Sequence, residues 1–396
     1  MADTHLLLVR IGELLHYYGT PSYRLEGVLT KVASSLNIPG VFLYTPTALH
    51  CSLGKIGEQQ TYLKRIAPGG EVDIAKLLAF DEVLEQLEAG KIPIDEASLR
   101  IESIAGSPPP YSVAATMLAS AVACLAVASI LGGGAADLVF AAIFGVFIEA
   151  FMRATAKLES PTGWSEPVIA FLIALSVSLL GRWLPLNVRL VTLAALILPI
   201  PGLTLTIAIT ELALSHLSAG TARLAGATSK LLAIVLGVAI AWRIVPTAET
   251  TEILLPLPEY LPWAITLVAP LAFAVVFRAP LRQWPVIVAV CIAGFTVAQA
   301  AGAALGPEMG ALLGAFVVGC SSNIYARVYN RPAMVPQTPA LLILVPGSIG
   351  YRALTAMIDA QTLRGMELAF SMVIIAAALA GGLLLASLFI PPKRFL

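Results

Sequence analysis

The chain has 396 residues, of which 58% are apolar and only 12% are charged, and its mean hydropathy is +0.87. A soluble domain typically has about a quarter charged residues, so this composition excludes a disordered chain, a nucleic-acid-binding protein and an ordinary cytosolic enzyme. The charges are unevenly placed, with 22 among the first 110 residues and 26 among the remaining 286. The sequence therefore predicts a normally charged front domain followed by an apolar region.

The front domain, residues 1–110, has the pattern of a small α+β fold. Residues 6–17 form an expected helix, and Thr20 and Pro21 suit the cap and first position of a second helix. Short alternating runs at 41–45, 48–53 and 60–66 predict strands, and two more helices are expected near 73–88 and 95–104. The proline-rich stretch 106–110 ends the domain as a stiff linker.

Polar residues of this domain have two interpretations. His16, Ser22, Arg24 and Glu26 cluster in sequence and could serve acid–base chemistry, but a set of capping and surface residues is the favoured reading. His50 and Cys51 are neighbours on an expected strand, so they point to opposite faces. The four cysteines lack CxxC spacing, which favours buried thiols over a disulfide framework or zinc site. We expect no metal and no cofactor.

The remaining sequence predicts a polytopic α-helical membrane protein with about ten spans. A first group of five lies in residues 111–245, a connection occupies 246–262, and a second group of five lies in 263–396. The expected spans are 112–131, 138–152, 167–181, 190–217, 224–242, 263–277, 286–301, 309–324, 340–358 and 368–390. No signal peptide is recognised, and nine Lys or Arg residues against five favour both termini in the cytoplasm.

An internal repeat organises the two groups. Pro201-Gly202 and Pro346-Gly347 interrupt apolar spans 145 residues apart, and Gly220 and Gly237 match Gly365 and Gly382 at the same offset. Because each half has an odd number of spans, the second half must be inverted in the membrane. Inverted repeats with paired broken helices are typical of transporters, whose substrates bind near the breaks.

The chemistry of such a break suits an anion. Proline removes a backbone donor, and a helix restarting beyond it offers free N–H groups and the positive end of its dipole. Thr204, Thr206 and Ser348 can add hydroxyl donors, so we expect a substrate carboxylate between the helices that restart after Gly202 and Gly347. A plain proline kink is the alternative, which the matched pair of breaks disfavours.

Ionisable and polar residues inside spans are further candidates. Arg352 and Asn323 are expected to help bind substrate, and Glu211, Glu149 and Asp359 are candidates for exchanging a proton. Glu149 and Arg153 are four residues apart and could instead pair with each other near the inner surface.

Several motifs resemble the threonine/serine exporter family. They are Tyr18-Gly19-Thr20-Pro21-Ser22-Tyr23-Arg24-Leu25-Glu26, Pro201-Gly202-Leu203-Thr204, Gly220-Thr221-Ala222-Arg223-Leu224, Val345-Pro346-Gly347-Ser348 and Tyr351-Arg352. The resemblance covers nearly the whole chain and implies a cytoplasmic domain followed by ten spans. It also implies proton-driven efflux of small hydroxy amino acids across the bacterial cytoplasmic membrane.

The sequence therefore predicts a secondary exporter, not an enzyme, whose partners are a carboxylate-bearing substrate, the proton and the lipid bilayer. The alternatives are a dicarboxylate exporter (succinate, as in related two-chain systems), a passive channel and a sensor that binds without transport. A membrane enzyme ranks lowest, because no nucleophile–base pair or metal cluster lies in the spans. Nucleic acid is not an expected partner, and the oligomeric state stays open, a homo-oligomer included.

Overall fold

The front domain joins four helices to a three-stranded antiparallel sheet, as the sequence predicts. The computed structural model describes residues 4–66, 72–156, 163–246, 257–258, 260–344 and 347–393. The elements of the front domain are α1 (Thr4–Tyr17), α2 (Ser22–Ser35), β1 (Gly40–Thr45), β2 (Ala48–Leu53), β3 (Gln60–Arg65), α3 (Ile74–Glu88) and α4 (Ile94–Gly106). β2 lies between β1 and β3, with Tyr44 opposite Leu49 and Cys51 opposite Tyr62.

Helix α2 begins one residue later than predicted. Pro21, and not Thr20, is its N-cap residue, and no side chain caps it. The buried Thr20 hydroxyl has no hydrogen-bond partner among the described residues. The expected Thr20 cap is therefore wrong, and the start of α2 is held by a distant residue described below.

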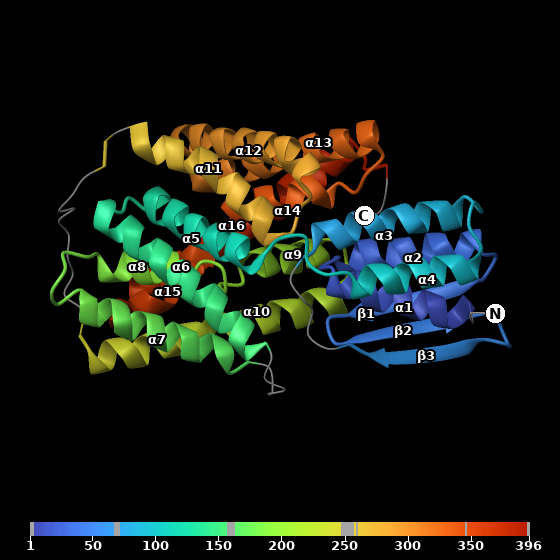
Figure 1. Ribbon diagram of the computed structural model, residues 1–396, viewed down its shortest axis with the longest axis horizontal. Helices are drawn as coiled ribbons and strands as arrows, with labels where there is room; N and C mark the ends of the chain where they lie inside the picture. Colours follow the sequence, from blue (N-terminus) through green and yellow to red (C-terminus); the bar gives the residue numbers. More distant parts are fainter. Residues whose placement is uncertain are drawn as a thin grey trace.

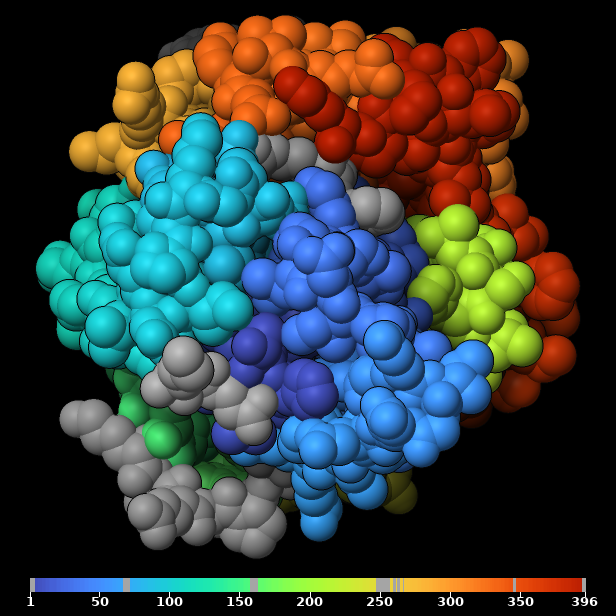
Figure 2. Space-filling view, turned by 90° about the vertical axis from the view of Figure 1, so that its right-hand side faces the viewer, coloured from blue at the N-terminus to red at the C-terminus, as the bar shows by residue number. Residues whose placement is uncertain are grey.

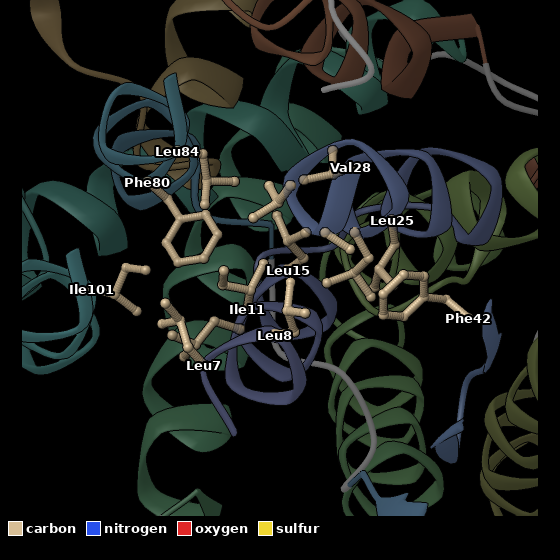
Figure 3. Close-up of a cluster of buried hydrophobic side chains, with 14 of the residues drawn as sticks. Leu7, Leu8, Ile11, Leu15, Leu25, Val28, Phe42, Phe80, Leu84 and Ile101 are labelled. Atoms are coloured by element: carbon tan, nitrogen blue, oxygen red, sulfur yellow. The ribbon is translucent and has the colours of Figure 1, made fainter. Parts of the chain in front are cut away.

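Alternation and helical periodicity explain the core of the front domain. Cys51 on β2 is fully buried while its neighbour His50 is exposed, as expected for opposite faces of a strand. Leu8, Ile11 and Leu25 from α1 and α2 pack with Phe80 of α3 (Figure 3). Burial of such side chains, at about 25 cal/mol per Å² of apolar surface, is the main force holding this domain together.

Long apolar helices make up the rest of the chain. Within the described ranges, seven helical stretches are long and apolar enough to cross a membrane. They are α5 (Val113–Ile130), α6 (Ala135–Thr155), α10 (Leu217–Ile244), η1 with α12 (Leu281–Leu305), α13 (Pro307–Tyr329), α14 with α15 (Met334–Ile358) and α16 (Thr362–Phe389). The remaining apolar helices are α7 (Ser165–Leu180), α8 (Val188–Ala195), α9 (Gly202–Ala213) and α11 (Tyr260–Val276). The chain is therefore a multi-pass membrane protein.

The front domain sits on one end of this helical bundle (Figure 1). We call this the domain end, and the opposite end the distal end. Seen along the long axis, the blue front domain lies in front of the bundle, with orange and red segments above it and a yellow-green one beside it (Figure 2). Backbone contact fixes the placement, because the N–H of Ile74 in α3 donates to the carbonyl of Phe277 after α11 at 3.0 Å.

Helix bounds and contacts repeat at the offset found in the sequence. α9 and α15 begin at residues 202 and 347, and α10 and α16 begin at 217 and 362, an offset of 145 in both cases. A methyl group on Gly237 would overlap the carbonyl oxygen of Pro167, and one on Gly382 would overlap that of Leu312, again 145 residues further on. The paired glycines thus serve the same close helix approach in both halves.

The two broken segments run in opposite directions. α8 begins at the distal end, and α9 ends at the front domain, where Glu211 accepts a hydrogen bond from Ser22. α14 begins at the front domain, where Arg24 donates to Gln337, and α15 ends at the distal end, where Asp359 pairs with Arg189 of α8.

Candidate functional site

The two predicted breaks meet in the bundle. A methyl group placed on Gly347 would lie 2.8 Å from Cγ2 of Ile200 and 3.0 Å from Cα of Gly202, so the starts of α9 and α15 touch backbone to backbone. We call this the break contact. Pro346 lies outside the described residues, and Gly202 is not among the described residues with a positive φ. Glycine is therefore needed at position 347 because a side chain there would collide with the start of α9.

Among the described residues, backbone donors in the first turn of α9 have no acceptor. Pro201 is its N-cap residue, with φ −80° and ψ 45°, and it provides no side-chain cap. The Gly202 N–H turns back to the carbonyl of Ile200 at 2.8 Å, and the first intrahelical bond joins Leu205 N–H to Pro201 at 3.0 Å. In an α-helix the N–H groups before that bond, here those of Leu203 and Thr204, lack an intrahelical acceptor. Such an end attracts an anion.

Polar residues continue from the break contact along α9. Thr206 and Thr210 follow Gly202 at four-residue spacing, and both are buried. Each hydroxyl donates back along the helix, Thr206 to Gly202 at 3.4 Å and Thr210 to Thr206 at 2.9 Å. We call this row the α9 stripe, and it leads toward the front domain.

The same spacing recurs on α15. Tyr351, Thr355 and Asp359 follow Gly347 at intervals of four residues, and the first two are buried. At about 100° per residue, successive members lie only about 40° apart around the helix. This α15 stripe leads from the break contact to the distal end.

A small cavity lies beside the segments that approach the breaks. Its volume is about 80 Å³, and it is enclosed by α5, α11 and the residues before each break, including Ile197 and Ile343. Among its lining residues, Ser348 carries the one polar side chain. An apolar pocket with a polar group at a helix start can hold a small amphiphilic molecule by its polar end.

Two of the predicted substrate residues lie elsewhere. Arg352 is exposed, and it lies about 140° around α15 from Gly347, because five residues separate them. Asn323 of α13 is buried, and its amide donates to the carbonyl of Ile390 after α16 at 2.8 Å. The structure thus brings Pro201, Gly202, Thr204, Thr206, Gly347 and Ser348 to the break region, but neither Arg352 nor Asn323.

Glu211 joins the bundle to the front domain. Its side chain is fully buried, and Arg223 of α10 donates to it from Nε at 2.9 Å and from Nη2 at 3.1 Å. The backbone N–H of Ser22, at the start of α2, donates to the same carboxylate at 2.8 Å. The carboxylate therefore neutralises an arginine and occupies the positive end of a helix of the front domain.

The other two acids are also paired with arginines. Arg153 donates from Nε to Glu149 at 2.6 Å, as their i, i+4 spacing suggested, and Ser120 donates to the second oxygen at 3.4 Å. Asp359 pairs with Arg189, whose guanidinium also lies over the ring of Trp242. A proton on any of the three acids would remove the negative charge that its arginine pairs with.

The polar cluster predicted in the front domain lies against the bundle. Glu26 accepts from the backbone N–H of Tyr44 at 2.8 Å and faces Nδ1 of His216, which precedes α10, at 3.4 Å. Burial raises the pKa of Glu26, and burial raises the pKa of Tyr44 to about 12. These residues therefore belong to the interface between the front domain and the bundle, which the sequence alone did not reveal.

Sequence reasoning also missed Arg189, Arg223 and Tyr351. The signal that could have found Tyr351 is its four-residue spacing from Gly347, which matches that of Thr206 from Gly202. No comparable signal exists for the arginines, because they reach partners on other helices.

Comparisons with known proteins agree with the resemblance. A family described as putative threonine/serine exporter matches residues 6–245, and one described as threonine/serine exporter matches residues 263–389. No solved structure matches.

Several relatives are fungal proteins. An uncharacterized protein of Schizosaccharomyces pombe is 22% identical over 97% of this chain and 51% of its own length. Pheromone-regulated membrane protein 10 of Saccharomyces cerevisiae is 24% identical over 98% of this chain and 54% of its own length. The protein of the same name from Pichia sorbitophila is 24% identical over 86% of this chain and 36% of its own length. The chain thus spans about half or less of these relatives, and they give no support to the expected bacterial membrane.

Proposed function

Because the chain belongs to the threonine/serine exporter family, we propose that it is a secondary exporter of small hydroxy amino acids, L-threonine and L-serine. The observation that carries this proposal is the break contact between Gly202 and Gly347. The start of α9 has N–H groups without an intrahelical acceptor, and Ser348 at the start of α15 lines a small cavity together with residues that precede both breaks. The substrate carboxylate binds these N–H groups, and hydroxyls such as those of Thr204 and Ser348 supplement them.

The transport path follows the two polar stripes. The α9 stripe leads from the break contact toward the front domain, and the α15 stripe leads toward the distal end. Two five-span repeats of opposite orientation account for this arrangement, because the broken segments α8–α9 and α14–α15 run in opposite directions. On this account α7, α11 and the α8–α9 segment also cross the membrane and complete ten spans.

Energy comes from the proton motive force. Glu211, Glu149 or Asp359 exchanges the proton, and protonation removes the charge that holds its arginine. A carboxylate in hydrocarbon is costly to keep charged without a partner, so breaking the pair favours proton uptake. The front domain and both termini lie in the cytoplasm, and the distal end faces outward.

Counterflow in proteoliposomes tests this function. Vesicles loaded with unlabelled threonine should transiently accumulate labelled external threonine or serine, and an imposed proton gradient should drive uphill movement of either. Succinate should not exchange. If succinate exchanged and threonine and serine did not, the substrate would be a dicarboxylate and not a hydroxy amino acid. Flux that never exceeds equilibrium under a proton gradient would indicate a channel, and binding without flux would indicate a sensor.

A further inference from the structure

The distal end of the bundle holds three hydrogen-bond donors without a partner in the described part of the chain, beside one ion pair. They belong to Arg189 of α8, Trp242 of α10 and Tyr351 of the α15 stripe, and with Asp359, which pairs with Arg189, these residues form what we call the distal cluster. The Arg189 guanidinium carbon lies 5.1 Å from the centre of the Trp242 ring, and Tyr351 belongs to the same buried hydrophobic cluster as Trp242.

Three atoms of the distal cluster have no partner among the described residues. They are Nε of Arg189, Nε1 of Trp242 and the hydroxyl of Tyr351, and all three atoms are buried. The side chains of Trp242 and Tyr351 are themselves 8% and 2% exposed. An unpaired buried polar group is costly, and native proteins rarely leave several together without a function. Because each of these groups can donate a hydrogen bond, the cluster lacks an acceptor.

The charges of the distal cluster indicate which kind of molecule it can bind. Arg189 and Asp359 form an ion pair in which Arg189 is 35% and Asp359 22% exposed, so the pair is reachable from the distal surface. A free amino acid carries a carboxylate and an ammonium group on one carbon. It can therefore enter such a pair with its carboxylate on the arginine and its ammonium on the aspartate.

We propose that the distal cluster is a second binding site, specific for a zwitterionic amino acid, through which the substrate passes on its way out. The substrate carboxylate takes the donors of Arg189, Trp242 and Tyr351, and the substrate ammonium takes Asp359. Asp359 and Arg189 pair with each other when the site is empty, which closes the path between α8 and α15. This inference rests on the proposed function. It also explains why the site would prefer an amino acid to a dicarboxylate, because Asp359 would repel the second carboxylate.

The position of the cluster fits a release site. Asp359 follows Gly347 by twelve residues, about 18 Å along the helix, whereas Tyr351 is one turn from the break contact. A molecule leaving the break contact along the α15 stripe therefore reaches the distal cluster from its Tyr351 side, and the ion pair lies on the side of the distal surface.

Tyr351→Phe separates a binding role from a structural one. Cells that express the full chain are loaded with labelled threonine, and its exchange is measured against increasing external threonine. Loss of one hydrogen bond to a charged group should raise the half-saturating external concentration about 10- to 100-fold. The thermal midpoint of the purified protein should stay equal or rise, because an unpaired buried hydroxyl is removed.

Tyr325→Phe is the matched control. The Tyr325 hydroxyl donates to Gln283 at 2.7 Å, so its removal should lower the thermal midpoint and leave the half-saturating concentration unchanged. An unchanged half-saturating concentration in Tyr351→Phe would overturn the proposed site.

Asp359→Asn tests recognition of the ammonium group. N-acetylthreonine has the carboxylate but no ammonium, so in the parent it should compete from outside at least about tenfold less well than threonine. In Asp359→Asn this difference should disappear, whereas a purely structural ion pair would leave it unchanged. If Asp359→Asn does not reach the membrane, the Tyr351→Phe result decides alone. A parent that exchanges no threonine or serine at all would overturn the proposed function together with this site.

Discussion

Replacing Glu211 by glutamine should loosen the front domain from the bundle. The carboxylate is fully buried and receives three hydrogen bonds, two from Arg223 and one from the N–H of Ser22. Glutamine keeps one acceptor oxygen but has no negative charge. The Arg223 side chain, which is only 16% exposed, would then be buried without that counterion. Breaking a buried ion pair from one side costs about 3–5 kcal/mol. The population of the undocked state should therefore rise about a hundredfold or more.

Thiol labelling measures that population directly. Ser22 is fully buried at the interface and its hydroxyl has no partner within the described part of the chain, so cysteine should be tolerated there. With the four native cysteines replaced, a maleimide should modify Ser22→Cys slowly in the parent and about a hundredfold faster beside Glu211→Gln. Glu149→Gln is the matched control, because Glu149 and Arg153 form a partly exposed pair worth about 1 kcal/mol or less.

The same variants also show what Glu211 does in transport. If Glu211 only carries the proton, Glu211→Gln should abolish uphill export, keep exchange and leave labelling of Ser22→Cys unchanged. That result would refute the anchoring role argued from the three hydrogen bonds.

Three further outcomes are expected. Gly382→Ala should lower the thermal midpoint because the added methyl group meets a backbone carbonyl. Gly381→Ala, whose methyl group points into open space, should be neutral or slightly stabilising. Equal effects of the two substitutions would contradict the close helix approach. An impermeant thiol reagent should label Trp183→Cys but not Ile56→Cys in intact cells, and the reverse would invert the topology. Burial raises the pKa of Glu26, so its contribution to stability is present below its ordinary pKa and is lost as pH rises through the raised one. The thermal midpoint of the parent should accordingly fall relative to Glu26→Gln as pH increases from acid, and a constant difference would argue against this linkage.

Local signals in the sequence predicted most of the elements. Alternation gave the three strands to within a residue, and the proline–glycine pairs marked the start of α9 and α15. These features depend on neighbours along the chain, which the sequence displays directly. Pairing of Glu149 with Arg153 was predictable for the same reason, since four residues bring two side chains together on any helix.

Contacts between distant residues could not be predicted. Ser22 and Glu211 are 189 residues apart, and Arg189 and Asp359 are 170 apart. Periodicity shows which face of a helix is buried, but it does not show which helix ends meet. For that reason the sequence predicted Glu211 only as a proton carrier in a span, whereas in the structure its carboxylate also accepts a hydrogen bond from Ser22 of the front domain.

Binding of threonine to the Gly347→Val variant tests the central claim most directly. The account places the substrate carboxylate on the N–H groups at the break contact, which valine side-chain atoms would cover. Each charge-assisted hydrogen bond is worth about 1.5–3 kcal/mol, so losing two should weaken binding by about two to four orders of magnitude. Calorimetry on monodisperse, detergent-purified protein should therefore detect no saturable threonine binding to Gly347→Val, and the parent should bind threonine but not its methyl ester. A Gly347→Val protein that binds threonine like the parent would contradict the account, and the breaks would be structural kinks.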